Sequence, residues 1–209
     1  MGGAKSTIRS RARREGREQS RRRIVEATIE LVRERSYAEL NVGEIMDRAG
    51  IGRTLFYRHF DDLGDLLTRV TREAIGELYE AELTLVDPRE MLDLDAVRPA
   101  IAATVAVFAR HGPLLRALSE AAAADPLVRA REAEMRDRFD RLIEATIRSG
   151  PGVTYPAPDP AESARALNRL NEAYLLDAFG RGPRVSPELA IETLTDIWLA
   201  FIARRRTRT

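Results

Sequence analysis

Several residue types are rare or missing in this sequence. Cysteine is absent from its 209 residues, histidine occurs twice and tryptophan once. Without cysteine the chain can form no disulfide framework, no thiolate nucleophile and no Cys-built zinc site, so we expect a reducing compartment. The longest strongly apolar run, residues 100–109, is about half as long as a bilayer span, and no apolar stretch follows the basic N-terminus as in a secretory signal. We therefore expect a soluble, cytoplasmic protein without a membrane partner.

Motifs of common enzyme chemistry are also missing. The sequence has no HExxH zinc motif, no glycine-rich phosphate loop, no nucleophile elbow and no Cys/His metal spacing. His111 precedes Gly-Pro at the expected end of a helix, where a cation is favoured, and we interpret it as a cap rather than a base. The sequence therefore predicts a protein that is not an enzyme and that uses no metal and no cofactor.

Positive charge is concentrated at the N-terminus. Residues 1–23 contain nine lysines and arginines against Glu15 and Glu18, although the whole chain has a net charge of +1. A basic segment ahead of an acidic body favours contact with nucleic acid or an anionic membrane surface. A flexible solubilising tail is the alternative, since so polar a segment cannot bury a core. We expect residues 1–17 to form a basic, disordered arm.

The rest of the chain has helical periodicity between turn signals, with no alternating strand pattern and no internal repeat. Expected helices cover residues 18–36, 42–49, 53–59, 62 to beyond 79, 97–113, 113–124, 126–149, 159–180 and 187–204. Pro88 is expected to break the fourth of these, and Asp125 is expected to cap the seventh, which begins with Pro126. These segments predict an all-α fold of about nine helices. We divide it into a three-helix N-terminal domain, 18–61, and a larger helical domain, 62–209.

The spacing within the N-terminal domain is that of a helix-turn-helix. Asn41 is a good N-cap for the second helix, and Gly50 ends it. In the segment that follows, Ile51, Phe56 and Phe60 are expected to point inward. The residues left largely outside are Arg53, Thr54, Leu55, Tyr57 and Arg58.

That outer face has the chemistry of a DNA reader. Arginine can fork onto guanine O6 and N7, threonine can reach a base or a phosphate, and leucine can touch a thymine methyl group. Tyr57 and His59 can donate to phosphate oxygens, which fixes position without reading sequence. The alternative is that these exposed side chains only solvate the outer face of a helix, but the basic arm is an independent indication of DNA binding.

The segment from residue 20 to 70 resembles the DNA-binding domain of TetR-family transcriptional regulators, and "TLFYRHF" carries the resemblance most specifically. The resemblance implies that Arg53, Thr54, Leu55 and Tyr57 meet the major groove. It also implies that His59 and the start of the second helix, Asn41 and Gly43, meet the DNA backbone. Its residues depart from the family pattern at Gly52, where a serine cap is common and glycine caps more weakly, and at Leu63, often lysine.

Asp61 and Asp62, which precede Leu63, are acidic and would repel DNA. Some of the affinity must then come from elsewhere in the chain. The basic arm can supply it by following the backbone or entering an adjacent minor groove. We therefore include Arg13, Arg14 and Arg17 among the expected DNA contacts.

The last two expected helices have wide apolar stripes. One stripe contains Leu167, Leu170, Tyr174 and Ala178, and the other contains Leu194, Ile197, Trp198 and Phe201. Self-association would cover both, and the family resemblance implies a homodimer formed by this helix pair, with its two base-contacting helices about 34 Å apart. The alternative is that both stripes are core of a monomer.

Asn168 and Asn171 share a helix face that is otherwise apolar. Their amides could bond each other or the backbone, or they could be the polar groups of a mostly apolar pocket. The pattern "LNRLNEAYLLDAFG" followed by "LAIETLTDIWLAFIA" resembles the C-terminal region of the EthR-like subgroup, whose long hydrophobic pocket has two such asparagines and a nearby tryptophan. The resemblance implies a ligand site formed by Phe108, Met135, Phe139, Asn168, Asn171, Glu172, Leu175 and Trp198.

Taken together, these features predict a dimeric, DNA-binding transcriptional regulator. We expect a repressor that a small hydrophobic effector releases from double-stranded operator DNA. Two alternatives remain open. One is a constitutive or architectural DNA-binding protein without an effector, and the other is an all-α enzyme or small-molecule carrier with an incidental N-terminal helix triplet.

Overall fold

A computed structural model describes residues 3–83, 94–149 and 159–203, and the expected break at Pro88 lies outside them. Regular structure in these ranges is entirely helical, which confirms the all-α class. The elements are α1 (Gly3–Glu34), η1 (Tyr37–Glu39), α2 (Val42–Ala49), η2 (Arg53–Arg58), α3 (Leu63–Val70), α4 (Arg72–Leu83), α5 (Leu94–Ala124), α6 (Pro126–Ser149), α7 (Pro160–Phe179) and α8 (Pro187–Ala203). In the same ranges, no helix is both long and apolar enough to cross a bilayer.

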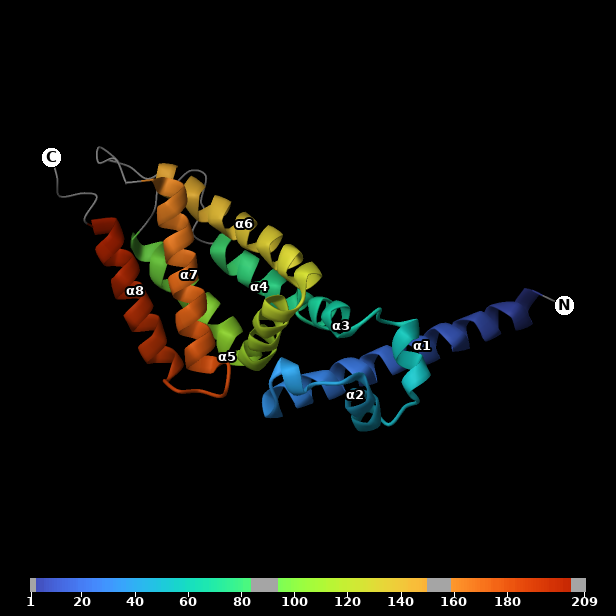
Figure 1. The fold of residues 1–209 in the computed structure, drawn as a ribbon. Helices are drawn as coiled ribbons and strands as arrows, with labels where there is room; N and C mark the ends of the chain where they lie inside the picture. The colour runs from blue at the N-terminus through green and yellow to red at the C-terminus, as the bar shows by residue number, and fades with distance from the viewer. Residues whose placement is uncertain (1–2, 84–93, 150–158, 204–209) are drawn as a thin grey trace.

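The molecule is elongated (Figure 1). We call α1, α2, η2 and α3 the head, and α4 to α8 the body. The N-terminal half of α1 projects beyond the head, and α8 lies at the opposite end of the molecule (Figure 1). In the described ranges, the eight α-helices and the 3-10 segment η2 agree in number with the about nine helices expected, but not one for one. The helix expected from residue 62 to beyond 79 is divided into α3 and α4, and those expected at 97–113 and 113–124 form the single helix α5.

Helix α1 is longer than expected. We predicted a disordered arm over residues 1–17, but α1 begins at Gly3 and continues without interruption to Glu34. Arginine is a good helix former, and adding residues to an existing helix costs far less than nucleating a new one. The C-terminal half of α1, which packs in the head core, therefore continues as a helix into the polar N-terminal half, which needs no core of its own.

Helix α5 also corrects an expectation, because it does not end at Pro113. It includes both Pro99 and Pro113 and continues to Ala124. Proline removes one main-chain hydrogen bond, but the packing against α7 holds the helix together. A Cβ atom on Gly112 would lie 2.4 Å from the main-chain oxygen of Phe179, so only glycine allows this close approach.

The hydrophobic interior consists of two clusters, and α5 takes part in both. The head core contains Phe56, Phe60 and Leu66, and α5 adds Leu114 and Leu118 to it. The body core contains residues of α4 to α8, including Val97, Phe108, Leu175 and Trp198. The expected domain boundary between residues 61 and 62 therefore does not separate the two clusters, because the head packs against the C-terminal part of α5.

Arg116 connects the head to the body. The side chain is 8% exposed, and its guanidinium donates to four acceptors from three parts of the chain. These are the main-chain oxygens of Gly180 (2.8 Å), Val32 (2.8 Å) and Arg35 (2.9 Å), and Glu120 Oε1 (2.6 Å). Arg116 thus holds the C-terminal end of α1 and the C-terminal end of α7 on the same helix.

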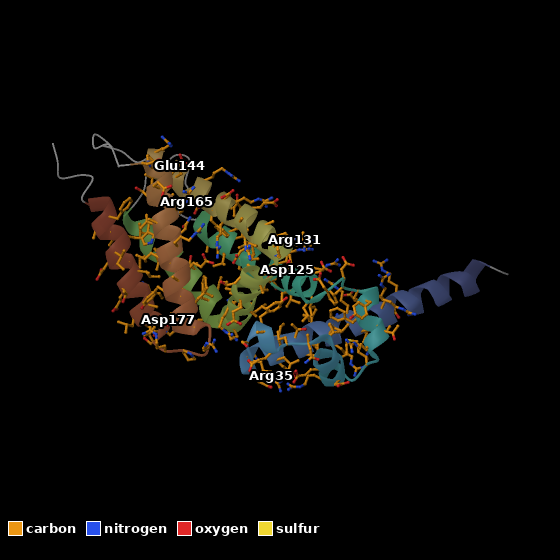
Figure 2. All side chains as sticks on the ribbon, viewed as in Figure 1. Arg35, Asp125, Arg131, Glu144, Arg165 and Asp177 are labelled. Atoms are coloured by element: carbon orange, nitrogen blue, oxygen red, sulfur yellow. The ribbon has the colours of Figure 1, made fainter. Side chains whose placement is uncertain are left out.

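The junction between α5 and α6 is formed as the sequence predicts. Asp125 lies between the two helices (Figure 2), and its Oδ1 accepts a hydrogen bond from the main-chain N–H of Leu127 at 2.7 Å. Pro126 is the first residue of α6. Proline suits this position because the first turn of a helix has no partner for its N–H groups.

Candidate functional site

The turn of the helix-turn-helix is set by two local features. Asn41 caps α2 by accepting a hydrogen bond from the main-chain N–H of Glu44 at 2.9 Å. Gly50 ends α2 with φ of 63°, in the left-handed region that favours glycine. Arg23 of α1 donates to the main-chain oxygen of Gly50 at 3.2 Å, which holds this turn against the first helix.

The segment after the turn, η2, separates its side chains into two sets. Phe56 is fully buried in the head core, and Ile51 and Phe60 also point inward, as expected. Arg53, Thr54 and Tyr57 are exposed, with Tyr57 at 57%. Gly52 caps η2 without a side-chain hydrogen bond, which agrees with the weak cap anticipated there. The outward set is available to a partner.

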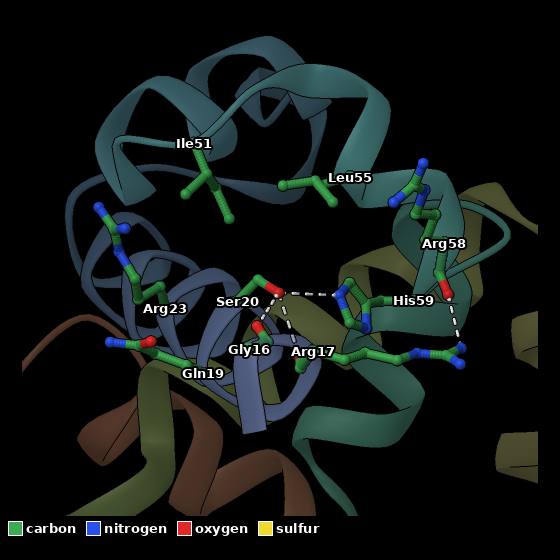
Figure 3. A pocket seen from close by; sticks show the side chains of 9 residues that line it. All are labelled: Gly16, Arg17, Gln19, Ser20, Arg23, Ile51, Leu55, Arg58 and His59. Atoms are coloured by element: carbon green, nitrogen blue, oxygen red, sulfur yellow. Dashed lines mark hydrogen bonds between the residues drawn. The ribbon is translucent and has the colours of Figure 1, made fainter. Parts of the chain in front are cut away.

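Leu55 and His59 face α1 instead of pointing outward with that set. With α1 they line an open cleft of about 820 Å³ (Figure 3). Arg17, Ser20, Arg23 and Arg58 also line it, and none of the described residues that line it carries a carboxylate. Arg17 closes one edge by donating to the main-chain oxygen of Arg58 at 3.0 Å. The cleft is therefore basic and lies beside the exposed face of η2.

His59 has a partner within the cleft. Its Nε2 lies 3.3 Å from the hydroxyl oxygen of Ser20, which also donates to main-chain oxygens of α1 (Figure 3). Burial, followed by the charges of Arg17 and Arg21, lowers the pKa of His59 below its ordinary value of 6.5. His59 is therefore mainly neutral near neutral pH.

The other residues expected at DNA fall around this face. Asn41 is exposed and Gly43 half-buried at the start of α2, and Arg14 and Arg17 are exposed on α1. Arg13 belongs to α1, but its side chain lies outside the described residues. Asp62 caps α3 by accepting from the main-chain N–H of Asp65 at 2.7 Å, so this acidic residue has a structural role.

A second candidate site lies in the body, where α4, α5, α6 and α7 enclose a cavity of about 80 Å³. Six of the eight residues expected at a ligand line it: Phe108, Met135, Phe139, Asn168, Asn171 and Glu172. Leu175 is fully buried in the body core and does not line the cavity. Trp198 does not line it either, but its Nε1 donates to Asn171 Oδ1 at 3.1 Å.

The two asparagines have fixed orientations. Asn168 Nδ2 donates to Asp140 Oδ1 at 2.9 Å, and a carboxylate can only accept, so the amide nitrogen must face Asp140. Trp198 has only an N–H donor, so the oxygen of Asn171 must face it. The asparagines therefore bond to Asp140 and Trp198 rather than to each other, and their polar groups cannot exchange places freely.

A charged group at this cavity was missed in the sequence. Arg136 donates from Nε and Nη2 to both carboxylate oxygens of Glu172, at 3.1 and 2.7 Å, and from Nη2 to Glu132 Oε1 at 3.0 Å. Glu132 and Arg136 are four residues apart on α6, a spacing that usually marks a solvated helix face. Only the packing of α7 against α6 brings Glu172 to them.

The apolar stripes of α7 and α8 are largely internal. Leu167, Ala178, Leu194 and Trp198 are buried in the body core. Leu170 remains 38% exposed, Ile197 37% and Leu189 51%. The described part of these two helices therefore has a small set of large apolar side chains on its outer surface.

Comparison with known proteins gives two family matches. "Bacterial regulatory proteins, tetR family" matches residues 24–70, and "Transcriptional regulator EthR, C-terminal domain" matches residues 97–203. The HTH-type transcriptional regulator EthR of Mycolicibacterium smegmatis is 29% identical over 190 residues, which cover 86% of this chain and 84% of that protein.

Solved structures show the same fold. NalD, the secondary repressor of the MexAB-OprM multidrug efflux pump in Pseudomonas aeruginosa, superimposes with a TM-score of 0.70 at 20% identity, covering 89% of this chain and 96% of that one. PfmR of Thermus thermophilus gives a TM-score of 0.67 at 21% identity, covering 85% and 97%. The two matched segments together show that the chain belongs to the TetR family of bacterial transcriptional regulators and has an EthR-type C-terminal domain.

Proposed function

We propose that this regulator is a dimeric repressor that a small effector releases from operator DNA. The observation that carries the proposal is the course of α5, which packs into the head core and also lines the body cavity. Leu118 is part of the head core and also lines the cavity. Leu115 lines the cavity as well and is part of the body core. A molecule that enters the cavity must displace α5 or its neighbours, and the head rests on that helix.

DNA binding rests on the exposed face of η2. Arg53 would fork onto a guanine, and Thr54 and Tyr57 would contact an adjacent base or phosphate. Asn41, Gly43, Arg14 and Arg17 would contact the backbone, together with Arg13. Leu55 and His59 would take part only if the DNA reaches the edge of the cleft beside α1. Such a protein acts in the cytoplasm, where its operator is.

The effector acts through the difference in its affinity for two arrangements of the head. An effector that prefers the arrangement unable to bind DNA lowers DNA affinity, and DNA lowers effector affinity by the same factor. A cavity of about 80 Å³ is smaller than the roughly 300 Å³ of an ordinary ligand pocket. Effector binding must therefore enlarge it, and this enlargement is what would move α5.

Dimerisation through α7 and α8 would use the exposed side chains Leu170, Leu189 and Ile197. Two heads related by a two-fold axis would then contact successive major grooves, about 34 Å apart. The effector would change this spacing. A constitutive DNA-binding protein would use the same dimer but would have no response to ligand.

The first test is fluorescence anisotropy with DNA from upstream of the protein's own coding sequence. The expected result is sequence-selective binding of two protomers per site that weakens as salt increases. A library of short duplexes should be used in parallel, so that a distant operator is also found. Equal affinity for scrambled DNA would favour the architectural alternative, and no binding to any duplex would contradict the proposal.

A further inference from the structure

The lining of the body cavity is charged on one side. Glu132 and Arg136 come from α6, and Arg169 and Glu172 come from α7. The Nε and Nη2 donors of Arg136 are already used by Glu132 and Glu172. A single guanidinium is therefore shared by two carboxylates, and a ligand that needs these donors would have to compete with both.

One acidic side chain of this group lies deeper than the other three charges. The side chain of Glu132 is 5% exposed, whereas those of Glu172, Arg136 and Arg169 are 25%, 27% and 42% exposed. Because water and salt screen exposed charges more than buried ones, the nearby arginines do not fully cancel the charge of Glu132. Burial raises the pKa of Glu132 above its ordinary value, against the attraction of Arg136. The deepest charged group at the cavity is therefore a carboxyl group.

One buried acceptor at the cavity has no hydrogen-bond partner. Among the described residues nothing donates to Asn168 Oδ1, whereas Asp140, which does not line the cavity, has Arg169 Nη2 and Arg165 Nε at 3.7 and 3.8 Å from its Oδ2. The amide nitrogen of Asn168 is committed to Asp140, which leaves only an oxygen on this cavity-lining residue. Buried acceptors without partners are unfavourable, and a ligand with N–H groups would relieve that cost.

The remainder of the lining is apolar and partly deformable. Ile75, Leu78, Phe108 and Leu118 face the cavity, together with Met135, whose unbranched side chain adapts easily. The present cavity of about 80 Å³ is comparable to two or three water molecules at roughly 30 Å³ each. It has the size of a polar head group, whereas the apolar part of a ligand would occupy space made by moving these side chains.

From these contacts we propose that the effector is an apolar molecule carrying a protonated amine. The ammonium group donates to a carboxylate oxygen of Glu132, the deepest charged group at the cavity. The apolar part lies against α4 and α5. This inference rests on the proposed function, because it assigns the chemical class of the effector for that cavity. A carboxylate of the same shape is repelled by Glu132 and Glu172 and should bind more weakly.

Three probes of equal shape test the assignment: 4-phenylbutylamine, 4-phenylbutanol and 4-phenylbutanoate. Their binding to the full chain is measured by isothermal titration calorimetry. The amine is expected to bind about tenfold or more tighter than the alcohol, as a charge-assisted hydrogen bond implies, and the carboxylate weakest of the three. A preference for the alcohol or the carboxylate, or no binding of any probe, would overturn the assignment.

A variant and a matched control locate the group responsible. Glu132→Gln should remove most of the preference for the amine and leave the affinity for the alcohol unchanged. Glu144→Gln is the control, since Glu144 is also on α6 and also pairs with an arginine four residues later, but does not line the cavity. An equal loss in both variants would contradict the role of Glu132.

The same probes separate this inference from the proposed function. If the alcohol releases DNA as effectively as the amine, the cavity is an effector site but the assigned chemical class is wrong. If the amine binds tightest and DNA stays bound, the assigned chemistry is correct but the effector role is wrong. Anisotropy of the protein–DNA complex during the titration distinguishes the two outcomes.

Discussion

The head and the body satisfy their buried polar groups to different extents. Among the side chains that the structure describes, the buried atoms without hydrogen-bond partners are all in the body: His111 Nε2, Asp140 Oδ2, Asn168 Oδ1 and Thr195 Oγ1. In the head, the buried side chains of Thr28, Asp65 and Thr71 each make a hydrogen bond to a residue four positions away. The described buried polar side chains of the head therefore have partners, whereas the body has buried polar atoms without one, including Asn168 Oδ1 at the cavity.

This difference suits the two tasks of a regulator. Base contacts require side chains fixed within a fraction of an ångström, which a small, fully satisfied domain provides. Effector binding requires a site whose alternative arrangements differ little in free energy. Because α5 belongs to both cores, the two regions are distinct in their hydrogen bonding but not independent in their packing.

The largest expected effect tests whether the two cores unfold together. Phe56→Ala in the head and Leu175→Ala in the body should each lower the free energy of unfolding, by about 3–5 and about 2–5 kcal/mol. Trp198, in the body core, is the only tryptophan and reports on the body by fluorescence. Phe56→Ala should shift the Trp198 transition as much as the circular dichroism transition. An unshifted Trp198 signal would show that the head unfolds alone.

Removal of Arg116 should weaken the connection between the regions. Arg116→Met leaves the buried main-chain oxygens of Val32, Arg35 and Gly180 without their donor, and we expect a loss of about 3 kcal/mol. Calorimetry should then resolve two transitions in place of one. Arg110→Met is the control, because Arg110 is on the same helix but 60% exposed. A similar loss in both variants would contradict the role of Arg116.

A smaller effect is expected at the DNA face. Arg53→Ala should weaken operator binding by about 1–3 kcal/mol and relax the preference at one base pair, without a change in stability. Arg131→Ala, an exposed arginine on α6 (Figure 2), should leave binding unchanged. If anisotropy shows that Arg53→Ala keeps the same sequence preference, Arg53 contacts phosphate or nothing.

The smallest effect concerns His59. Its pKa is lowered in the folded chain, so the neutral form is favoured and its contribution to stability is complete above about pH 6.5. That contribution is lost as the pH falls through the lowered pKa. His59→Gln should therefore lose less thermal stability than the parent chain between about pH 7 and pH 5. If DNA affinity also rises in that range only in the parent chain, His59 contacts a phosphate.

The helix-turn-helix was predictable because its determinants are local. Asn41, Gly50 and Phe56 act within a few residues of their own position, through a cap, a left-handed turn and a buried ring. The inward side of η2 was predicted less completely. Leu55 and His59 face α1, where Ser20 lies 39 residues before His59 in the sequence, and no local pattern predicts a contact over that separation.

The sequence by itself determined the all-α class, the family and six of the residues around the body cavity, since periodicity, caps and motifs lie in short stretches of chain. Only the tertiary structure decided the continuity of α5 through Pro113, the four hydrogen bonds of Arg116 and the sharing of Arg136 by Glu132 and Glu172. These features join residues far apart in sequence, and their free energies depend on burial, which arises only when the helices pack.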